Sequence, residues 1–420
     1  MPVSDSQKSL AKLPLVCADQ ALPWREHDGD VHVDRRRDVC GIVLAGSHNW
    51  GDGRFERMLR GPLLPIAQTP LICYSLDWLR LGGVQSATIC ASRSTAAVRE
   101  FLGAGLAVGI ALDYVEDVEP RGPAGCAHDA ARQSAACVFV VVEGSMIPSL
   151  DLAALLQAHA ISGAAATVVV EIERRTRPGA MSEPRQPGGV YVFDRRVLDA
   201  VPARGYQDIK QGLLERLYAA GERVLTYEVR GIAPRVLDSS TYASVDRWLI
   251  TEEIRSAHFL GDYERVDEAL QHPTAVVHPT ARIIGPVLLG AGVVVEANAV
   301  LIGPMSVGRQ SVISANAVVS RSCIWEHCVV GEGANVDTSL LADHAVVGAA
   351  EWLFASVHMP AEMVKLAAPS RAARASLRTL LPHVGSSRVV SDVPVRVPVG
   401  FPFADSLEHR ANTGEFQAMQ

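Results

Sequence analysis

The chain has 420 residues, of which 48% are hydrophobic and 20% are charged, and its formal net charge is −7. This balance is typical of a globular protein with roughly two or three domains, and the negative charge argues against a broad basic surface for nucleic acid or anionic membranes. Because no apolar run approaches the length that spans a bilayer, and residues 1–20 lack the apolar core of a signal peptide, we expect a cytoplasmic protein.

Residues 1–37 are polar and irregular, and they end in an arginine-rich stretch that predicts a flexible, solvated arm. From residue 38 to residue 262, short apolar runs alternate with segments that have apolar side chains at helical spacing. The expected strands are 39–46, 86–92, 137–144 and 166–172; the expected helices are 68–82, 95–105, 128–136 after a glycine turn, and 151–163 with Asp151 as N-cap. This alternation predicts a Rossmann-like α/β domain with a mostly parallel sheet, helices on both faces and a ligand site at the carboxyl ends of the strands.

Residues 263–350 repeat an apolar residue every six positions, and most of these are followed four positions later by a smaller side chain. The repeat is carried by Val277, Ile283, Leu289, Val295, Leu301, Val307, Ile313 and Val319, and after a slip of one position near Ser322 by Ile324, Val330 and Val336. This period predicts a left-handed parallel β-helix of hexapeptide repeats, with the apolar residues in its interior. Because such coils are scaffolds whose faces support assembly, we expect a homo- or hetero-oligomer.

Residues 351–420 lose the six-residue period, and we expect a partly helical C-terminal extension to which we assign no function. The eight cysteines are scattered without a CxxC pair, which predicts reduced structural thiols. A zinc site at Cys323, His327 and Cys328 is disfavoured, because no second ligand pair has zinc-site spacing. The lone histidines of the repeat region are expected to be surface or turn residues: His278, His327 and His344.

Several segments of the first domain share a pattern with one enzyme family. They are GPLLPIAQTPLICYSLDWLRLGGV (61–84), EPRGPAGCAHDAA (119–131), VFVVVEGSMIPSLDLAALLQAH (138–159), GGVYVFDRRVLDAV (188–201) and RVLDSSTYASVD (235–246). Together with the strand that ends in LAG (44–46) and the hexapeptide coil, they resemble the sugar-1-phosphate nucleotidyltransferases, or NDP-sugar pyrophosphorylases, of the GDP-mannose and glucose-1-phosphate type. The resemblance spans roughly Val39 to Gly348 and implies a nucleotidyltransferase domain followed by the β-helix.

The resemblance implies a reaction in which a sugar 1-phosphate attacks an NTP and pyrophosphate leaves. The protein positions the reactants and neutralises charge, and Mg²⁺ held by Asp residues bridges phosphate oxygens. A glycine-rich loop receives the nucleotide, because backbone N–H groups can approach phosphates closely there. On this pattern the nucleotide-binding positions are Leu44, Ala45, Gly46, Gly122, Ala124 and Gly125. For the glycines near residue 122, a tight turn without a ligand is an equally good interpretation.

The charged positions of the family pattern hold other residues in this chain. The family's LAGGxGTRLxPLTxxxPKPLLPI aligns without a gap on residues 44–66, which places Gly51 at the Arg and Gly61 at the Lys. The metal-binding Asp at the strand end is Ser145, and the second one aligns with Arg235. Removing one charge-stabilising group costs about 3–4 kcal/mol of transition-state stabilisation. The loss of four therefore predicts a degenerate active site.

Two further features bear on the pocket. In the family, a hairpin with a Glu-Lys-Pro motif lines the sugar pocket. Too few residues lie between Thr167 and Gly188 for this hairpin, and Glu183–Pro184 would be the remnant of its motif. Glu143 lies two residues before Ser145, so its side chain should leave the strand on the same face and could hold a metal ion. Other candidate ligands are Asp52, Glu56 and Asp238, for which solvent-exposed or capping roles are the simpler interpretation.

Three functions fit this sequence. The favoured one is a catalytically impaired regulatory or structural subunit that binds a nucleotide or nucleotide sugar and pairs with a catalytic family member. The second is an active nucleotidyltransferase with a rebuilt metal site at Glu143, and only this one would need Mg²⁺. The third is a ligand-free scaffold. None of the three implies a nucleic-acid or membrane partner.

Overall fold

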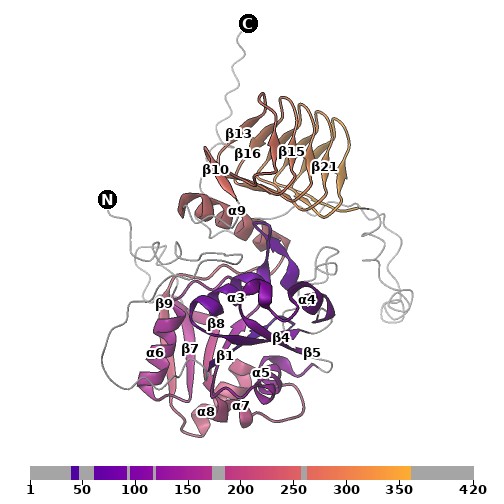
Figure 1. Cartoon of the computed structure of the whole chain (residues 1–420). Helices are drawn as coiled ribbons and strands as arrows, with labels where there is room; N and C mark the ends of the chain where they lie inside the picture. Colours follow the sequence, from indigo (N-terminus) through magenta and orange to yellow (C-terminus); the bar gives the residue numbers. More distant parts are fainter. Residues whose placement is uncertain are drawn as a thin grey trace, which may run out of the picture.

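The computed structural model describes residues 39–46, 61–91, 95–116, 120–172, 185–256 and 263–360. Four predicted segments lie outside the described residues: the arm at 1–37, most of the family loop at 47–60, the Glu183–Pro184 pair and the extension beyond residue 360. An α/β domain, a long helix and a stack of short strands follow one another along the chain (Figure 1). Among the described helices, none has both the length and the apolar composition needed to cross a membrane.

The first domain is built on a seven-stranded sheet with the order β5-β4-β1-β6-β8-β7-β9. Its strands are β1 (Val39–Leu44), β4 (Ser86–Ala91), β5 (Ala111–Glu116), β6 (Val138–Glu143), β7 (Ala166–Ile172), β8 (Arg185–Asp194) and β9 (Val224–Arg230). Every neighbouring pair is parallel except the two pairs made by β8. The mostly parallel sheet predicted from the sequence is confirmed, and its near-continuous apolar strands suit a sheet covered on both faces.

Helices cover both faces of this sheet, as predicted. They are α3 (Leu71–Leu81), α4 (Thr95–Leu102), α5 (Gly122–Gln133), α6 (Leu152–Ser162), α7 (Arg195–Asp199) and α8 (Leu214–Ala219), with short turns η2 (Gly61–Leu63), η3 (Leu106–Val108) and η4 (Ile209–Leu213). One buried cluster joins α5, α7 and α8 to the sheet, and a second joins α3, α4 and α6 to it. The Asp151 carboxylate accepts a hydrogen bond from the backbone of Ala154, which confirms the predicted N-cap of α6.

The start of α5 differs from the sequence prediction. A glycine turn was expected before a helix at 128–136, but the helix already begins at Gly122 and ends at Gln133. Pro123 explains the early start, because a proline in the first helical turn has no N–H that would need a partner. The glycine-rich segment is therefore the first turn of a helix.

The second half of the chain forms a parallel β-helix, which confirms the architecture predicted from the six-residue period. One of its three sheets contains β10 (Glu264–Val266), β11 (Ala269–Gln271), β14 (Val287–Leu289), β17 (Met305–Val307), β20 (Cys323–Ile324), β23 (Leu340–Leu341) and β26 (Val357–His358). The second contains β12 (Val276–Val277), β15 (Val294–Val295), β18 (Val312–Ile313), β21 (Val329–Val330) and β24 (Val346–Val347). The third contains β13 (Arg282–Ile284), β16 (Val300–Ile302), β19 (Val318–Ser320), β22 (Asn335–Asp337) and β25 (Trp352–Phe354).

Strand register explains the slip in the sequence period. Val294 pairs with Val312, but Val312 pairs with Val329, so the later coil is one residue shorter. The coil also continues past residue 350, because β25 and β26 pair with β22 and β23. The exposed aromatic side chains of Trp352 and Phe354 flank the inward Leu353 and obscure the repeat at that point.

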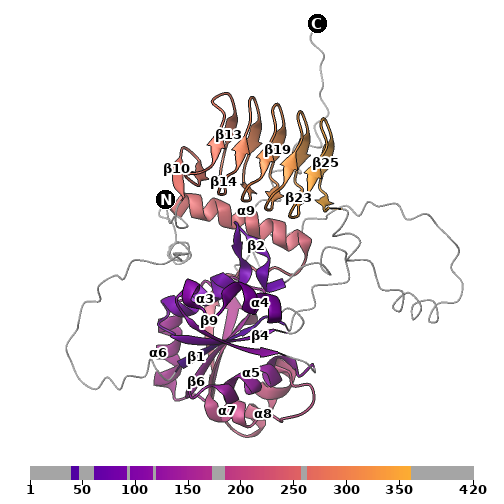
Figure 2. The ribbon, with the colours of Figure 1, turned by 45° about the vertical axis from the view of Figure 1, so that its right-hand side comes forward.

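The helix α9 (Ser239–Ser256) lies between the two halves, against one sheet of the β-helix and the hairpin of β2 (Pro65–Ile66) and β3 (Thr69–Pro70) (Figure 2). Asp246 of α9 accepts hydrogen bonds from the backbone of Ala67 at 2.7 Å and from the Cys323 thiol at 2.8 Å. Gln68 donates from its side chain to the backbone carbonyl of Val307 at 2.8 Å. The β-helix is thus fastened to the residues that follow the family loop.

The remaining side chains named in the repeat region have structural surroundings. His327 and His344 lie in left-handed turns and stack with ring centroids 4.9 Å apart, and His278 is exposed. Cys323 and Cys328 are buried, and burial raises the pKa of the Cys328 thiol to about 12. These residues are the turn and core side chains that the sequence predicts.

Candidate functional site

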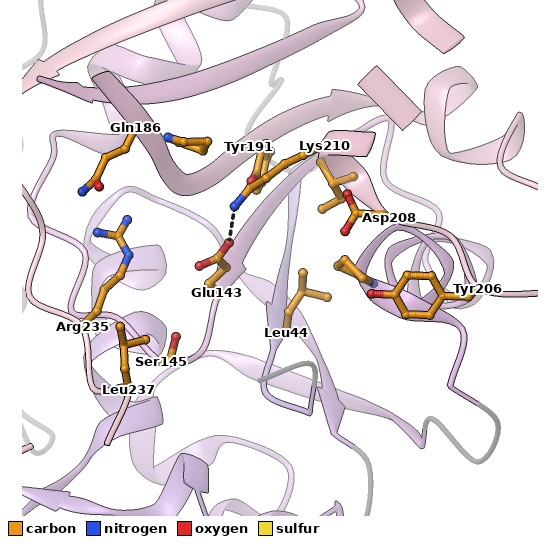
Figure 3. Close-up of a pocket in the computed structure, with 13 residues that line it drawn as sticks. Leu44, Glu143, Ser145, Gln186, Tyr191, Tyr206, Asp208, Lys210, Arg235 and Leu237 are labelled. Carbon is orange, nitrogen blue, oxygen red and sulfur yellow. Dashed lines mark ion pairs between the residues drawn. The ribbon is translucent and has the colours of Figure 1, made fainter. Parts of the chain in front are cut away.

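A cavity of about 460 Å³ lies at the carboxyl ends of β1 and β6 (Figure 3). Ligands of open α/β sheets usually bind at this end of the strands. Its lining consists of Leu44, Pro123, Glu143, Ser145, Gln186, Pro187, Tyr191, Tyr206, Asp208, Ile209, Lys210, Arg235 and Leu237. The lining therefore comes from β1, α5, β6, β8, the η4 turn and the segment before α9. Four of these residues carry formal charges, two of each sign.

The ends of β1 and β6 meet closely at one wall of the cavity. The backbone of Gly144 donates to the carbonyl of Leu44 at 3.0 Å, and a Cβ at Gly144 would lie only 3.1 Å from that oxygen. A side chain at this position would crowd the Leu44 backbone, so glycine favours the close approach. Leu44 lines the cavity, whereas Ala45 and Gly46, which follow it, are not among the lining residues. Ala45 is buried and bonds through its N–H to Cys90.

The predicted nucleotide loop at α5 is covered by another segment of the chain. Gly122 has a φ of +73°, and a Cβ there would lie 2.6 Å from the backbone oxygen of Gln207 and 2.9 Å from the ring of Tyr206. At Gly125, a Cβ would meet the side chain of Arg121 at 2.7 Å. The small residues thus make room for neighbouring parts of this chain, and Pro123 is the member of the segment that lines the cavity.

The two positions that align with metal-binding aspartates are adjacent in space. Met146 and Arg235 form an isolated antiparallel bridge, and the backbone of Val236 donates to the carbonyl of Ser145 at 2.8 Å. Ser145 and Arg235 both line the cavity. The fold therefore brings a hydroxyl and a guanidinium to one place, although they are far apart in the sequence.

Arg235 is held by a buried carboxylate. Its two terminal nitrogens lie 2.8 and 3.1 Å from the two carboxylate oxygens of Glu171 on β7, a bidentate arrangement that is strong and geometrically specific. The side chains are 15% and 4% exposed, respectively. Glu171 also accepts from the backbone of Ala233 at 3.1 Å and from the Gln186 amide at 3.2 Å. This network fixes the guanidinium near Gln186, while the backbone of the Arg235 segment lies next to Ser145 (Figure 3).

Glu143, the last residue of β6, lines the cavity together with Ser145, although Ser145 lies in the turn after the strand and not on the strand as the sequence predicted. Its carboxylate lies under Gly189, where a Cβ would come within 2.9 Å of an oxygen of Glu143. The Lys210 ammonium lies 3.6 Å from the other oxygen, and Figure 3 shows the two side chains pointing toward one another. The carboxylate considered as a metal ligand therefore already has a cationic neighbour.

Polar side chains on the opposite wall complete the cavity. Tyr191 is 1% exposed, and its hydroxyl has no hydrogen-bond partner among the described residues. Burial, followed by the nearby charges of Glu143 and Asp208, raises the pKa of Tyr191, so its hydroxyl keeps its proton and can donate. Asp208 accepts from the backbone of Gln211 at 2.7 Å and caps the η4 turn that carries Lys210.

The described residues do not fit a magnesium site of the family type. Mg²⁺ prefers oxygen ligands, mainly carboxylates, but the two family positions hold Ser145 and Arg235, and Glu143 is paired with Lys210. Asp238 caps the start of α9 by accepting from Thr241 and does not line the cavity. In the part of the chain that the structure describes, no three His, Cys, Asp or Glu side chains are placed to hold a metal ion. The candidates Asp52 and Glu56 lie outside that part.

Sequence reasoning missed several residues of this site, among them Glu171, Tyr191 and Lys210. Glu171 gave a signal, because it is the one charged residue in the apolar run 166–172, and a carboxylate buried in a strand needs a partner. Tyr191 sits in the recognised segment 188–201 but looks like a core residue. Lys210 gave no signal, because its partner Glu143 is distant in the sequence.

Comparisons with known proteins agree with the resemblance. A family model described as nucleotidyl transferase matches residues 57–186. The mannose-1-phosphate guanylyltransferase of Mycobacterium tuberculosis is 24% identical over 283 residues, which cover 61% of this chain and 76% of that protein. A solved glucose-1-phosphate thymidylyltransferase from Bacillus anthracis superposes with a TM-score of 0.43 at 18% identity, over 50% of this chain and 94% of the other. The matched region of the family model includes Glu143 and Ser145 and ends in β8.

Proposed function

We propose that this chain, which belongs to the sugar-1-phosphate nucleotidyltransferase family, binds a nucleotide sugar but is impaired in making one. In this proposal it acts as a regulatory or structural subunit in sugar-nucleotide metabolism. The observation that carries the proposal is the Arg235–Glu171 pair beside Ser145. A fixed cation with a neutral hydroxyl beside it is the reverse of the carboxylate pair that would hold a divalent metal.

The chemistry of the family explains why this exchange would impair turnover. Phosphoryl transfer depends almost wholly on positioning and on electrostatic stabilisation of the phosphates. The Arg and Lys positions of the family loop are Gly51 and Gly61, so two further cations are missing. Lys210 is the exposed cation of the described cavity, and its charge is shared with Glu143. One such group is a poor substitute for a metal ion and two loop cations.

Binding makes smaller demands on the cavity than catalysis does. The described lining offers hydroxyls at Ser145 and Tyr206, an amide at Gln186 and the Lys210 ammonium. Such groups suit the hydroxyls of a sugar and the oxygens of a diphosphate. The cavity of about 460 Å³ falls in the range of small-molecule sites. These features support retained binding over the ligand-free scaffold.

An active enzyme with a rebuilt metal site is the second candidate, and one observation favours it. Glu143 lines the cavity next to Ser145, and its partner Lys210 is 47% exposed at a distance of 3.6 Å, so the pair could separate. A metal ion held by Glu143 would then need further oxygen ligands, and Ser145 and Asp208 line the same cavity.

Pyrophosphate release separates these possibilities. The purified chain is supplied with Mg²⁺, pooled NTPs and pooled hexose 1-phosphates, beside a family member that retains the Asp and Arg residues. We expect no release above background from this chain, together with binding of a nucleotide sugar in calorimetry. Release that Glu143→Ala abolishes would overturn the proposal in favour of the active enzyme. Absence of both release and binding would favour the scaffold.

The subunit role includes assembly in the cytoplasm, as a homo-oligomer or with a catalytic family member. The β-helix supports this part of the proposal, because it presents regular exposed faces that include Trp352 and Phe354. Light scattering after size exclusion measures the mass of the purified chain. A mass equal to one 44.9 kDa chain at all concentrations would contradict homo-oligomer formation.

A further inference from the structure

We infer that the cavity binds its phosphate-bearing ligand without a divalent cation, because the Arg235 guanidinium, held by Glu171, occupies a metal-ligand position of the family and Lys210 supplies an exposed positive charge to the cavity. This inference rests on the proposed function and extends it. It assigns the electrostatic role of the metal to side chains of the chain itself. It also predicts which phosphate compounds the cavity accepts.

The charge at the former metal position is balanced without an ion. In the family pattern, two aspartates and one Mg²⁺ sum to zero. In this chain the same positions hold neutral Ser145 and cationic Arg235, and the buried carboxylate of Glu171 balances the guanidinium. A divalent cation placed there would meet a guanidinium, and the lining carboxylate of Glu143 already has the Lys210 ammonium beside it. The described residues therefore oppose metal binding at this point.

Arg235 is placed too firmly to move away from an incoming metal ion. Its backbone is bridged to Met146, and its side chain makes the bidentate contact with Glu171 and a further hydrogen bond to the carbonyl of Ala233 at 3.2 Å. These contacts use several of the guanidinium donors, so Arg235 acts mainly as a fixed local charge. Lys210, the other cation of the lining, is therefore the residue that we expect to contact the phosphate directly.

Lys210 has the exposure and the position for that contact. Its ammonium lies 3.6 Å from Glu143, a distance beyond a strong hydrogen bond, so its three donors remain available to a ligand. It sits on the η4 turn, whose first N–H groups are capped by Asp208. Figure 3 shows the Lys210 side chain reaching across the cavity from this turn.

Tyr191 is a second and independent indication that a ligand belongs here. A buried hydroxyl without a partner is costly, because its lost hydrogen bond to water is not replaced. The Tyr191 hydroxyl has no partner among the described residues, although its side chain lines the cavity. The hydroxyl oxygen is itself buried, so a ligand oxygen would accept this hydrogen bond once the side chains that cover it shift.

The charges also limit the ligand class. The four charged lining residues sum to zero, and the Glu171 carboxylate that holds Arg235 brings the group to one net negative charge; Lys210 is the substantially exposed cation among them. One such cation suits the diphosphate ester of a nucleotide sugar or a single sugar phosphate. A free triphosphate carries more negative charge and needs a metal ion or the missing loop cations. We therefore expect the nucleotide sugar to bind more tightly than the NTP when no metal is present.

Calorimetry on the full chain tests this inference. GDP-mannose, ADP-glucose and dTDP-glucose are titrated in EDTA and in Mg²⁺, and the tightest of them is then compared with its parent NTP. We expect the Kd of the nucleotide sugar to change by less than about twofold between the two conditions, and Lys210→Gln to weaken binding about tenfold or more. Lys210→Arg should retain most of the affinity because it keeps the charge.

Arg204→Gln is the matched control, because it removes one exposed positive charge from the same loop without touching the cavity. It should bind like the unmodified chain, and circular dichroism should show that all variants are folded. Binding that requires Mg²⁺, or a Lys210→Gln variant that binds normally, would overturn the inference while leaving the proposed binding function intact. Absence of binding in both conditions would overturn the proposed function as well.

Discussion

Breaking the Glu171–Arg235 pair should destabilise the α/β domain more than breaking any exposed ion pair. Glu171→Leu leaves the guanidinium of Arg235 without its carboxylate in a site where only 15% of that side chain is exposed. Removing one partner of a buried ion pair costs about 3–5 kcal/mol, because the other charge stays buried without compensation. The residual exposure of Arg235 places the expected cost near the lower end, at about 3 kcal/mol.

The reverse substitution should cost less. Arg235→Met leaves Glu171 buried, but a carboxylate can take up a proton and lose its charge, so we expect about 2 kcal/mol. The double variant removes both charges and leaves mainly the N–H of Ala233 without an acceptor, so it should also cost about 2 kcal/mol. The coupling energy of this double-mutant cycle is then about 3 kcal/mol.

Urea unfolding at pH 7, followed by near-ultraviolet circular dichroism, provides the free energies. The exposed pair of Arg185 and Glu228 is the control cycle, since its side chains are 63% and 44% exposed at a separation of 3.1 Å. Its coupling should be below about 1 kcal/mol. If the coupling between Glu171 and Arg235 were no larger than that of the control, the guanidinium would not be fixed by its carboxylate. The electrostatic argument for the site would then fail.

Three further predictions concern the joint and the β-helix. Burial raises the pKa of Asp246 above 3.8, so between pH 3.8 and its raised pKa the folded state binds more protons than the unfolded state, and the unfolding free energy falls as the pH rises. Asp246→Asn should reduce this change of unfolding free energy with pH, measured by urea unfolding at several pH values. An unchanged pH dependence would contradict the raised pKa. Burial also raises the pKa of Cys323 well above 9.0, so a thiol reagent should modify exposed Cys137 before Cys323. Labelling of Cys323 as early as Cys137 in mass spectrometry would contradict the burial of Cys323. Leu301→Ala should lower the unfolding free energy of the β-helix by about 2–5 kcal/mol, since Leu301 is fully buried; a loss below about 1 kcal/mol in urea unfolding would mean that the coil core is loosely packed.

Local patterns were sufficient for the architecture. The six-residue period predicted the β-helix because each coil packs only on its neighbours, so the identity of every inward residue is set by the same local geometry. The α/β domain followed from alternating apolar runs, and Asp151 capped α6 as its position before the helix predicts. The early start of α5 was missed, because the helical preference of Pro123 in a first turn competed with the turn signal of its glycine neighbours.

The sequence alone also indicated that the family's charged positions are lost, since identities at aligned positions can be read without coordinates. Only the tertiary structure determined what replaced them. Arg235 pairs with Glu171 across 64 positions of sequence, and Lys210 of the η4 turn lies beside Glu143 of β6 in the same cavity. These pairs depend on how β7, the η4 turn and the segment before α9 converge, and side-chain charges carry no local signal of their distant partners. The packing of the β-helix depends on residues that are close in the sequence, so the sequence predicts it. The ion pairs of this cavity form between distant segments that come together only in the folded protein.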